Sequence, residues 1–570
     1  MSLLRTLDAG TMAEDQGWLF RIMMLFVTLG GVFIISVLIG IITTGLEGRL
    51  RALQRGRSKV IESNHTVILG WSEKIFTVIN EICIANENQK YGCIVILGDQ
   101  DRVTMEEQIA EAVTDTRGTR IVCRSGSPID PASLEILRLH AAKSIVILAP
   151  KGEAPDAEVI KICMAITRHA KRGDKPFHIV AELRQEGNLD IARIVGGDEV
   201  EWVLSDDIIS RMIVQTCHQS GLSIIYTDLM DYAGDEIYFY SHPNLVGKPF
   251  GDLLNCFEKN LVMGIWKKGA RPVLNPPMDT MFAMDDHIFV LAEDDDQIFF
   301  TDFNTGFIKE EQIQHMDSEI HVPEKILILG WNTKAERILL EMDHYIPKGS
   351  EILVVANPLH VQNVPAWNNI KLKNARLKFQ HGNTNDRSLL EKLTPEKYEH
   401  IILLSYSDNL SYQVADSRTM IALLHLRDIA NKCPGCQFSI VTEMLDLRNR
   451  ELAEITQVDD FVVSDYFISL YLSQVSETKL LNAVFQNLLD SEGSEVYLRP
   501  AQDYVVLNEA VNFYTLVESA RRKDEIALGY RIGAYADDPD QTFGIVLNPK
   551  KSETYLYQQH DQVIVLSETF

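Results

Sequence analysis

The longest apolar run in the chain lies close to its N-terminus. Residues 22–42 read IMMLFVTLGGVFIISVLIGII, with no charged side chain and only Thr28 and Ser36 as polar interruptions. At about 1.5 Å of rise per residue, a helix of this length spans roughly 30 Å, which is the thickness of the hydrocarbon layer of a bilayer. The pattern therefore predicts one transmembrane helix. Within it, Gly30 and Gly31 form the candidate hinge, because adjacent glycines allow a helix to bend.

Charged residues on the two sides of this run differ in sign. Acidic side chains precede it, whereas Arg49, Arg51, Arg55, Arg57 and Lys59 follow it. Positive charge next to a membrane helix marks the cytoplasmic side. We therefore expect an integral membrane protein whose residues 49–570 are cytoplasmic.

The rest of the chain contains an internal repeat with an offset of about 260 residues. The apolar segment HTVILGWS at 65–72 recurs as KILILGWN at 325–332. Two later phrases recur in the same order, namely HIVAEL at 178–183 with SIVTEM at 439–444, and VLSDDIIS at 203–210 with VVSDYFIS at 462–469. The sequence therefore predicts two tandem copies of one folding unit.

Each copy alternates short β-branched runs with longer segments of helical periodicity. Continuous apolar strands separated by helices are typical of a parallel sheet covered on both faces. A smaller unit follows each copy, and both smaller units contain the phrase VLNP, at 273–276 and at 546–549. We predict an α/β fold class, with two tandem Rossmann-like units, small α+β C-terminal subdomains and one preceding transmembrane helix.

A nucleotide site is the first chemistry to test in a Rossmann-like sheet. Such a site needs several glycines after the first strand, so that backbone amides can approach a pyrophosphate. The first copy has only Gly70, followed by Trp71 and Ser72, while Asp99 and Arg124 follow the next two strands. These five residues are the positions at which a nucleotide would bind. The full glycine signature is absent from the sequence, so a nucleotide is the less favoured ligand.

Acidic side chains gather at the end of the first small unit and suggest a different ligand. The set comprises Asp285, Asp286, Glu293, Asp294, Asp295 and Asp296. Carboxylates converging from a loop suit a hard cation such as calcium, which takes six to eight oxygen ligands. A solvated acidic surface is the alternative reading of the same residues, and the sequence leaves both open.

Other classes of function are disfavoured by composition and motif content. The formal net charge is −26, from 54 basic and 80 acidic side chains, so the surface repels phosphate backbones and nucleic acid is not an expected partner. The fifteen histidines form no HExxH pair, and the sequence has no GxSxG segment. We therefore do not expect an enzyme.

Over essentially its whole length the chain resembles the CASTOR/POLLUX family of cation channels. The matching segments are LDAG at 7–10, HTVILGWS at 65–72, VCRSGSP at 122–128, VGGD at 195–198 and LAEDDD at 291–296. The resemblance implies a homotetramer in which each repeated unit is an RCK-like domain of a cytoplasmic gating ring. It also implies calcium-sensitive gating, contact with membrane lipid and passage of a permeant cation. By the same resemblance, Asp8, Ala9 and Gly10 form the selectivity filter.

The resemblance also suggests how the chain is divided. The predicted segments are a filter-like pore loop at 1–17, an inner transmembrane helix and basic linker at 18–60, a first RCK Rossmann-like domain with crossing helices at 61–228 and its C-terminal subdomain at 229–300, a linker at 301–322, and a second RCK Rossmann-like domain with crossing helices at 323–485 and its C-terminal subdomain at 486–570.

Two hypotheses of function follow. The first is a subunit of a tetrameric, ligand-gated cation channel, with calcium as the expected ligand and the ring coupled to the inner helix. The second is a membrane-anchored regulatory subunit that senses calcium or a nucleotide for a separate ion transporter. It arises because six residues precede Leu7, where the family carries an outer membrane helix and a pore helix.

Overall fold

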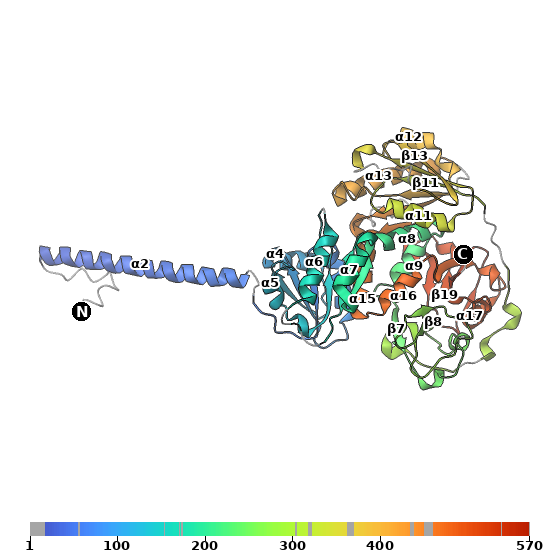
Figure 1. Ribbon diagram of the computed structural model, residues 1–570, viewed down its shortest axis with the longest axis horizontal. Coiled ribbons are helices and arrows are strands. Elements are labelled where there is room, and N and C mark those ends of the chain that lie inside the picture. The colour runs from blue at the N-terminus through green and yellow to red at the C-terminus, as the bar shows by residue number, and fades with distance from the viewer. Residues whose placement is uncertain are drawn as a thin grey trace.

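A long N-terminal helix projects from an α/β body in the computed structural model of the chain (Figure 1). The structure describes residues 17–54, 58–152, 154–169, 172, 175–302, 305–316, 322–361, 370–433, 438–449, 460–536 and 538–568. The filter positions Asp8, Ala9 and Gly10 lie outside the described residues.

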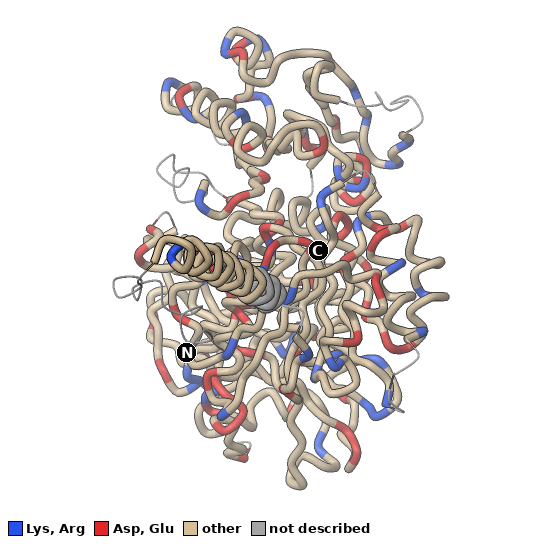
Figure 2. The backbone as a smooth tube through the Cα atoms, turned by 90° about the vertical axis from the view of Figure 1, so that its left-hand side faces the viewer, with Lys and Arg blue, Asp and Glu red and all other residues tan. Residues whose placement is uncertain are grey.

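Helix α2 (Trp18–Gln54) contains the predicted membrane segment. Its portion Trp18–Thr43 is long and apolar enough to cross a bilayer, and little of that portion is buried against the rest of the chain. Figure 2 shows the helix as tan along most of its length, whereas acidic and basic positions are scattered over the α/β body. The helix continues through Gly30 and Gly31, so a hinge there stays a prediction.

The first repeated unit is a six-stranded parallel sheet with strand order β3-β2-β1-β4-β5-β6. Its strands are β1 (His65–Leu69), β2 (Cys93–Gly98), β3 (Arg120–Ser125), β4 (Ala142–Ile147), β5 (Ile179–Leu183) and β6 (Val200–Leu204). Helices α3 (Lys74–Ala85) and α4 (Arg102–Ala112) cover one face. Helices α5 (Pro131–Glu135), α6 (Pro155–Thr167) and α7 (Leu189–Gly196) cover the other.

The second unit repeats this topology, with strand order β13-β12-β11-β14-β15-β16 and parallel pairing throughout. Its strands are β11 (Lys325–Leu329), β12 (Ser350–Ala356), β13 (Ala375–His381), β14 (His400–Leu403), β15 (Ser439–Met444) and β16 (Asp460–Val463). Helix α11 (Ala335–Tyr345) covers one face. Helices α12 (Arg387–Leu393) and α13 (Tyr412–Asn431) cover the other.

Each unit is followed by a small antiparallel subdomain. The first has the order β7-β10-β8-β9, and the second has β17-β22-β19-β20 with a separate β18-β21 pair. Their elements are α9 (Leu222–Asp228), β7 (Glu236–Tyr240), α10 (Phe250–Leu253), β8 (Leu261–Trp266), β9 (Val273–Leu274), β10 (His287–Ala292), α16 (Leu481–Leu488), β17 (Glu495–Pro500), β18 (Ala510–Asn512), α17 (Phe513–Arg521), β19 (Ile526–Arg531), β20 (Ile545–Leu547), β21 (Thr554–Leu556) and β22 (Gln562–Ser567). The predicted fold class is thereby confirmed.

The helix that ends each Rossmann-like unit crosses to the other unit. Helix α8 (Ser205–His218) follows the first sheet along the chain, yet it packs on α11 and on β14, β15 and β16 of the second. Helix α15 (Ser464–Glu477) does the converse and packs on α3, β4 and β5 of the first (Figure 1). One continuous hydrophobic core therefore joins both units, because each supplies the helix that covers its partner's sheet.

Candidate functional site at the interface of the repeated units

The exchanged helices enclose two buried ion pairs that occupy equivalent positions in the two repeats. Lys74, at the start of α3, places its Nζ 2.7 Å from Glu182 Oε1 and 3.4 Å from Asp465 Oδ1. Lys334, which caps α11, places its Nζ 3.0 Å from Glu443 Oε1. Charges this deeply buried are tolerated only when they are paired. The Lys74–Glu182 and Lys334–Glu443 pairs each lie within one unit, and the Lys74–Asp465 contact joins the first unit to helix α15 of the second.

Both pairs are built from the phrases that recur in the sequence. Each lysine follows a Gly-Trp turn, which is Gly70-Trp71 in the first unit and Gly330-Trp331 in the second. Each glutamate lies in the fifth strand of its unit, and Asp206 and Asp465 lie in the first turn of the crossing helices. Ser210 Oγ lies 3.4 Å from the Lys334 carbonyl oxygen, and Ser469 Oγ lies 3.3 Å from that of Lys74. The repeated motifs thus converge on one interface with approximate two-fold symmetry.

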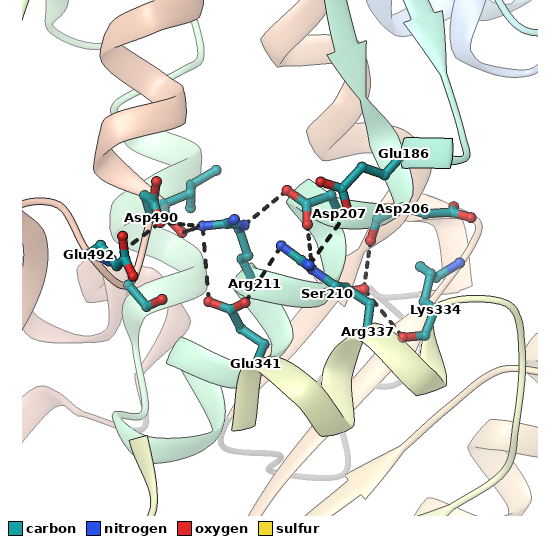
Figure 3. A network of polar contacts seen from close by, with 12 residues as sticks. Glu186, Asp206, Asp207, Ser210, Arg211, Lys334, Arg337, Glu341, Asp490 and Glu492 are labelled. Atoms are coloured by element: carbon teal, nitrogen blue, oxygen red, sulfur yellow. Dashed lines mark hydrogen bonds and ion pairs between the residues drawn. The ribbon is translucent and has the colours of Figure 1, made fainter. Parts of the chain in front are cut away.

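A wider polar network extends this interface along α8 (Figure 3). Arg337 Nε lies 2.6 Å from Asp207 Oδ1, which links α11 to α8. Arg211 lies between Asp207 and Asp490, with its Nη1 2.9 Å from Asp490 Oδ1. Glu341 is within 4.0 Å of both guanidinium groups. Three segments are therefore joined by charge-assisted contacts, which are stronger than neutral hydrogen bonds.

A cavity of about 360 Å³ opens between the carboxyl ends of the two sheets. Its lining includes Lys151, Arg184, Asp206, Asp408 and Tyr412. Thr333 Oγ1 lies 3.3 Å from both Asp206 Oδ2 and Asp408 Oδ1, so a carboxylate from each unit meets at one hydroxyl. Burial raises the pKa of both aspartates. The carboxyl ends of parallel strands are where α/β folds usually bind ligands.

The predicted nucleotide positions lie at the ends of β1, β2 and β3, and nucleotide binding there stays a prediction. Gly70 has a φ of +96°, and a Cβ there would lie 3.0 Å from the Leu148 carbonyl oxygen. The positive φ therefore favours glycine at this turn, where the backbone of Leu148 also approaches closely. The Trp71 ring packs edge-to-face on Phe76, with 5.9 Å between centroids. Ser72 is buried, and Asp99 is exposed at the end of β2.

Arg124 contacts the segment that follows α2. Its Nε donates to the Ser58 carbonyl oxygen at 2.8 Å, and its Nη1 donates to the Cys123 carbonyl oxygen at 2.8 Å. The Arg124 guanidinium thus binds the backbone of the segment between α2 and the first sheet. Binding of a nucleotide by Arg124 stays a prediction.

Further contacts fix this linker, which we define as Ser58–Asn64. Arg138 Nη1 donates to the Ile61 carbonyl oxygen at 2.6 Å, and Arg120 Nη1 lies 2.6 Å from Glu62 Oε1. Backbone bonds from Val60 to Ile136 and from Asn64 to Ala141 add to these. Sequence reasoning missed these residues, because an isolated arginine on a strand or turn carries no signal of its partner.

Two of the acidic residues proposed for calcium, Asp286 and Asp294, accept hydrogen bonds from backbone amides in local turns. Asp286 Oδ2 accepts from the Ala283 amide at 2.9 Å. Asp294 accepts from the Asp295 amide at 2.7 Å and from Asn88 Nδ2 at 3.0 Å. Asp285 and Glu293 lie at the two ends of β10. Among the described residues, no group of three or more His, Cys, Asp or Glu side chains is arranged to hold a metal, so calcium binding here stays a prediction.

Comparison with known proteins identifies the family. Residues 206–305 match the family model described as "Castor and Pollux, part of voltage-gated ion channel", and residues 62–187 match the slowpoke-like RCK domain of a calcium-activated potassium channel. The "Probable ion channel POLLUX" of Arabidopsis thaliana is 31% identical over 99% of this chain and 71% of its own length. The chain belongs to the CASTOR/POLLUX family of ion channels.

Two further similarities place this CASTOR/POLLUX member more fully. The "Probable ion channel CASTOR" of Oryza sativa subsp. japonica is 30% identical over 98% of the chain, which covers 66% of that relative. The chain thus spans about two thirds of the length of the curated relatives it matches. The human SLO3 gating ring superposes with a TM-score of 0.63 over 88% of this chain and 99% of its own, at 14% identity. That likeness shows a gating-ring fold.

Proposed function

We propose that the chain is a subunit of a homotetrameric, calcium-sensitive cation channel whose gating ring acts on helix α2. The observation that carries the proposal is the attachment of the Ser58–Asn64 linker to the first sheet. Three side-chain contacts and two backbone hydrogen bonds hold a segment that begins four residues after the last residue of α2. A displacement of the first unit would therefore move the segment that follows the helix.

Assembly into a ring is supported by exposed apolar residues on the outer helices of both units. On α7, Ile191 is 59% exposed and Ile194 is 84% exposed. On α13, Val414, Ile421 and Leu424 are each 44–50% exposed. Both helices cover the sheet face that points away from the interface between units. Apolar surface clustered in this way is typical of contacts between copies.

Assembly is tested by the mass of the full chain in detergent. Ile194→Glu should reduce the tetramer, because it places a charge in the proposed contact. Met284→Glu is the matched control, since Met284 is 79% exposed but lies in the small subdomain. Equal loss of tetramer in both variants, or retention in Ile194→Glu, would remove α7 from the assembly surface.

Coupling is tested by single-channel recording of the full chain in a planar bilayer. Arg124→Gln should weaken the dependence of open probability on ligand while leaving unitary conductance unchanged, because it releases Ser58 without touching the pore. Arg117→Gln is the control, since Arg117 pairs with Glu87 on the same unit and has no contact with the linker among the described residues. The proposal fails if both variants behave like the wild type.

The ligand is tested by adding calcium to the ring side during such recordings. The description of the matched RCK family model as that of a calcium-activated channel supports calcium. Neutralising Asp294, Asp295 and Asp296 to Asn should shift the response to higher calcium. If calcium binds but these changes have no effect, the site lies elsewhere. If calcium has no effect on open probability, nucleotides acting at Asp99 become the next candidates.

The filter assignment is tested at Asp8, where Asp8→Asn should change cation permeability ratios because it removes a charge from the pore mouth. Unchanged ratios would exclude Asp8 from the filter. A protein that carries no current alone, but changes the activity of a copurifying transporter, would favour the regulatory-subunit hypothesis.

A further inference from the structure

A partly buried cluster of two histidines and a glutamate lies at the end of the unit interface opposite the cavity. His218 is the last residue of α8, His400 is the first residue of β14, and Glu324 immediately precedes β11. Glu324 Oε2 lies 3.7 Å from His218 Nε2 and 3.7 Å from His400 Nε2, and the two imidazole centroids are 5.3 Å apart. The cluster thus joins the crossing helix of the first unit to two strands of the second.

We infer that Glu324, His218 and His400 form a proton-sensitive contact that holds the end of helix α8 on the second unit. Both imidazoles are already oriented by their Nδ1 atoms. His218 Nδ1 lies 3.0 Å from the Val214 carbonyl oxygen, and His400 Nδ1 lies 2.7 Å from Ser439 Oγ. Their Nε2 atoms are therefore directed at Glu324, whose Oε2 has no hydrogen-bond partner within the described part of the chain.

The surroundings of the cluster favour its uncharged form. Tyr345 on α11 lies beside His218, with 5.6 Å between ring centroids, and its hydroxyl contacts Glu495 of β17. Cys217 on α8 and Ser439 on β15 complete the contact. Glu399, before β14, is the charged neighbour of Glu324, and its negative charge opposes ionisation of the Glu324 carboxyl. An ionised Glu324 would thus be a buried charge beside another anion, which is unfavourable.

The pKa values give the direction of the response. Burial, and then the charge of Glu399, raise the pKa of Glu324 to about 7. The stability that protonated Glu324 contributes is therefore fully present below the ordinary pKa of a glutamate and is lost as the pH rises through 7. Burial lowers the pKa of His218, and burial followed by the charge of His218 lowers that of His400 to about 3. The histidines therefore stabilise the contact above their ordinary pKa, and this contribution is lost as the pH falls.

The test is hydrogen exchange at the backbone amides of residues 214–219 in the full-length protein. The local opening constant of the wild type, divided by that of Glu324→Gln, should rise about tenfold or more between about pH 5.5 and pH 7.5. The rise is expected because Glu324 ionises over this range, whereas the glutamine cannot. The ratio of wild type to His400→Gln should change in the opposite sense, falling as the pH rises towards about 6.5. This second variant keeps the test decisive if Glu324→Gln fails to fold.

Glu81→Gln is the matched control. Burial also raises the pKa of Glu81 to about 7, but Glu81 lies on α3 and accepts from the Tyr232 amide. The opening constant of the wild type at residues 214–219, divided by that of Glu81→Gln, should not change with pH. A flat ratio for Glu324→Gln, or the same rise for Glu81→Gln, would overturn the inference. So would slowing of exchange by added Zn²⁺ in the wild type but not in His400→Gln, which would make the cluster a metal site. Any effect on gating rests on the proposed function, whereas the exchange measurement does not.

Discussion

The two repeated units share a strand order and a buried lysine–glutamate pair, but they differ in what surrounds that pair. In the first unit, Lys74 has Glu182 and Asp465 as partners, and the positive charge of the nearby Arg184 disfavours the protonated form of Lys74. In the second, the charges of Glu443, Asp206 and Asp408 all favour the protonated form of Lys334. Acidic neighbours therefore favour the charged lysine in both units, and in the first unit a second cation lies close to it.

A second difference lies in what each unit is attached to. The first sheet holds the Ser58–Asn64 linker through Arg124, Arg120 and Arg138. The second sheet instead carries the histidine–glutamate cluster at the end of α8. The first unit therefore carries the contacts to the Ser58–Asn64 linker, and the second carries the histidine–glutamate cluster. Three pairs of equivalent substitutions test how the two units differ.

The largest effect is expected from removing the lysines. Lys334→Met should lower the free energy of unfolding by about 3–5 kcal/mol, because it leaves Glu443 buried without its cation. Lys74→Met should cost less, since loss of Lys74 also relieves its repulsion with Arg184. Differential scanning calorimetry at neutral pH measures both as shifts in Tm. The double variant Lys334→Met, Glu443→Gln should recover much of the loss, whereas a larger shift for Lys74→Met would reverse the comparison.

An intermediate effect is expected at the glycine of each Gly-Trp turn. Gly330 has a φ of +107°, and a Cβ there would lie 2.1 Å from the Leu404 carbonyl oxygen, against 3.0 Å from Leu148 O at Gly70. Gly330→Ala should therefore cost about 2–3 kcal/mol, from positive φ and a backbone clash together. Gly70→Ala should cost about 1 kcal/mol, chiefly from positive φ. Equal Tm shifts would show that the backbone relaxes around both turns alike.

The fold could be predicted from the sequence, whereas most contacts at the interface between the units could not. Apolar runs such as HTVILGWS predicted the first strand of each sheet, because strands buried on both faces need continuous apolar side chains. The family resemblance implied crossing helices in each unit. The buried pairing of Lys74 with Glu182 and Asp465 could not be predicted, because these residues are far apart in sequence and their pairing depends on how two similar units dock. Arg124 was identified as a binding residue by its position after a strand. Its partner is the Ser58 carbonyl oxygen, which no motif indicates.

The smallest effect is expected where the turns differ by one residue. Asn332 Nδ2 donates to Glu443 Oε2 at 2.7 Å and to the Ser405 carbonyl oxygen at 2.8 Å. Its equivalent, Ser72, has a buried Oγ with no hydrogen-bond partner in the described ranges. Asn332→Ala should cost about 1.5 kcal/mol, because a buried carboxylate loses a donor. Ser72→Ala should be neutral or slightly stabilising, because it removes a hydroxyl whose burial is not compensated. Calorimetry of both variants measures the difference. A loss of stability in Ser72→Ala as large as that in Asn332→Ala would mean that the Ser72 hydroxyl has a partner. The second unit would then be no more firmly paired at this turn than the first.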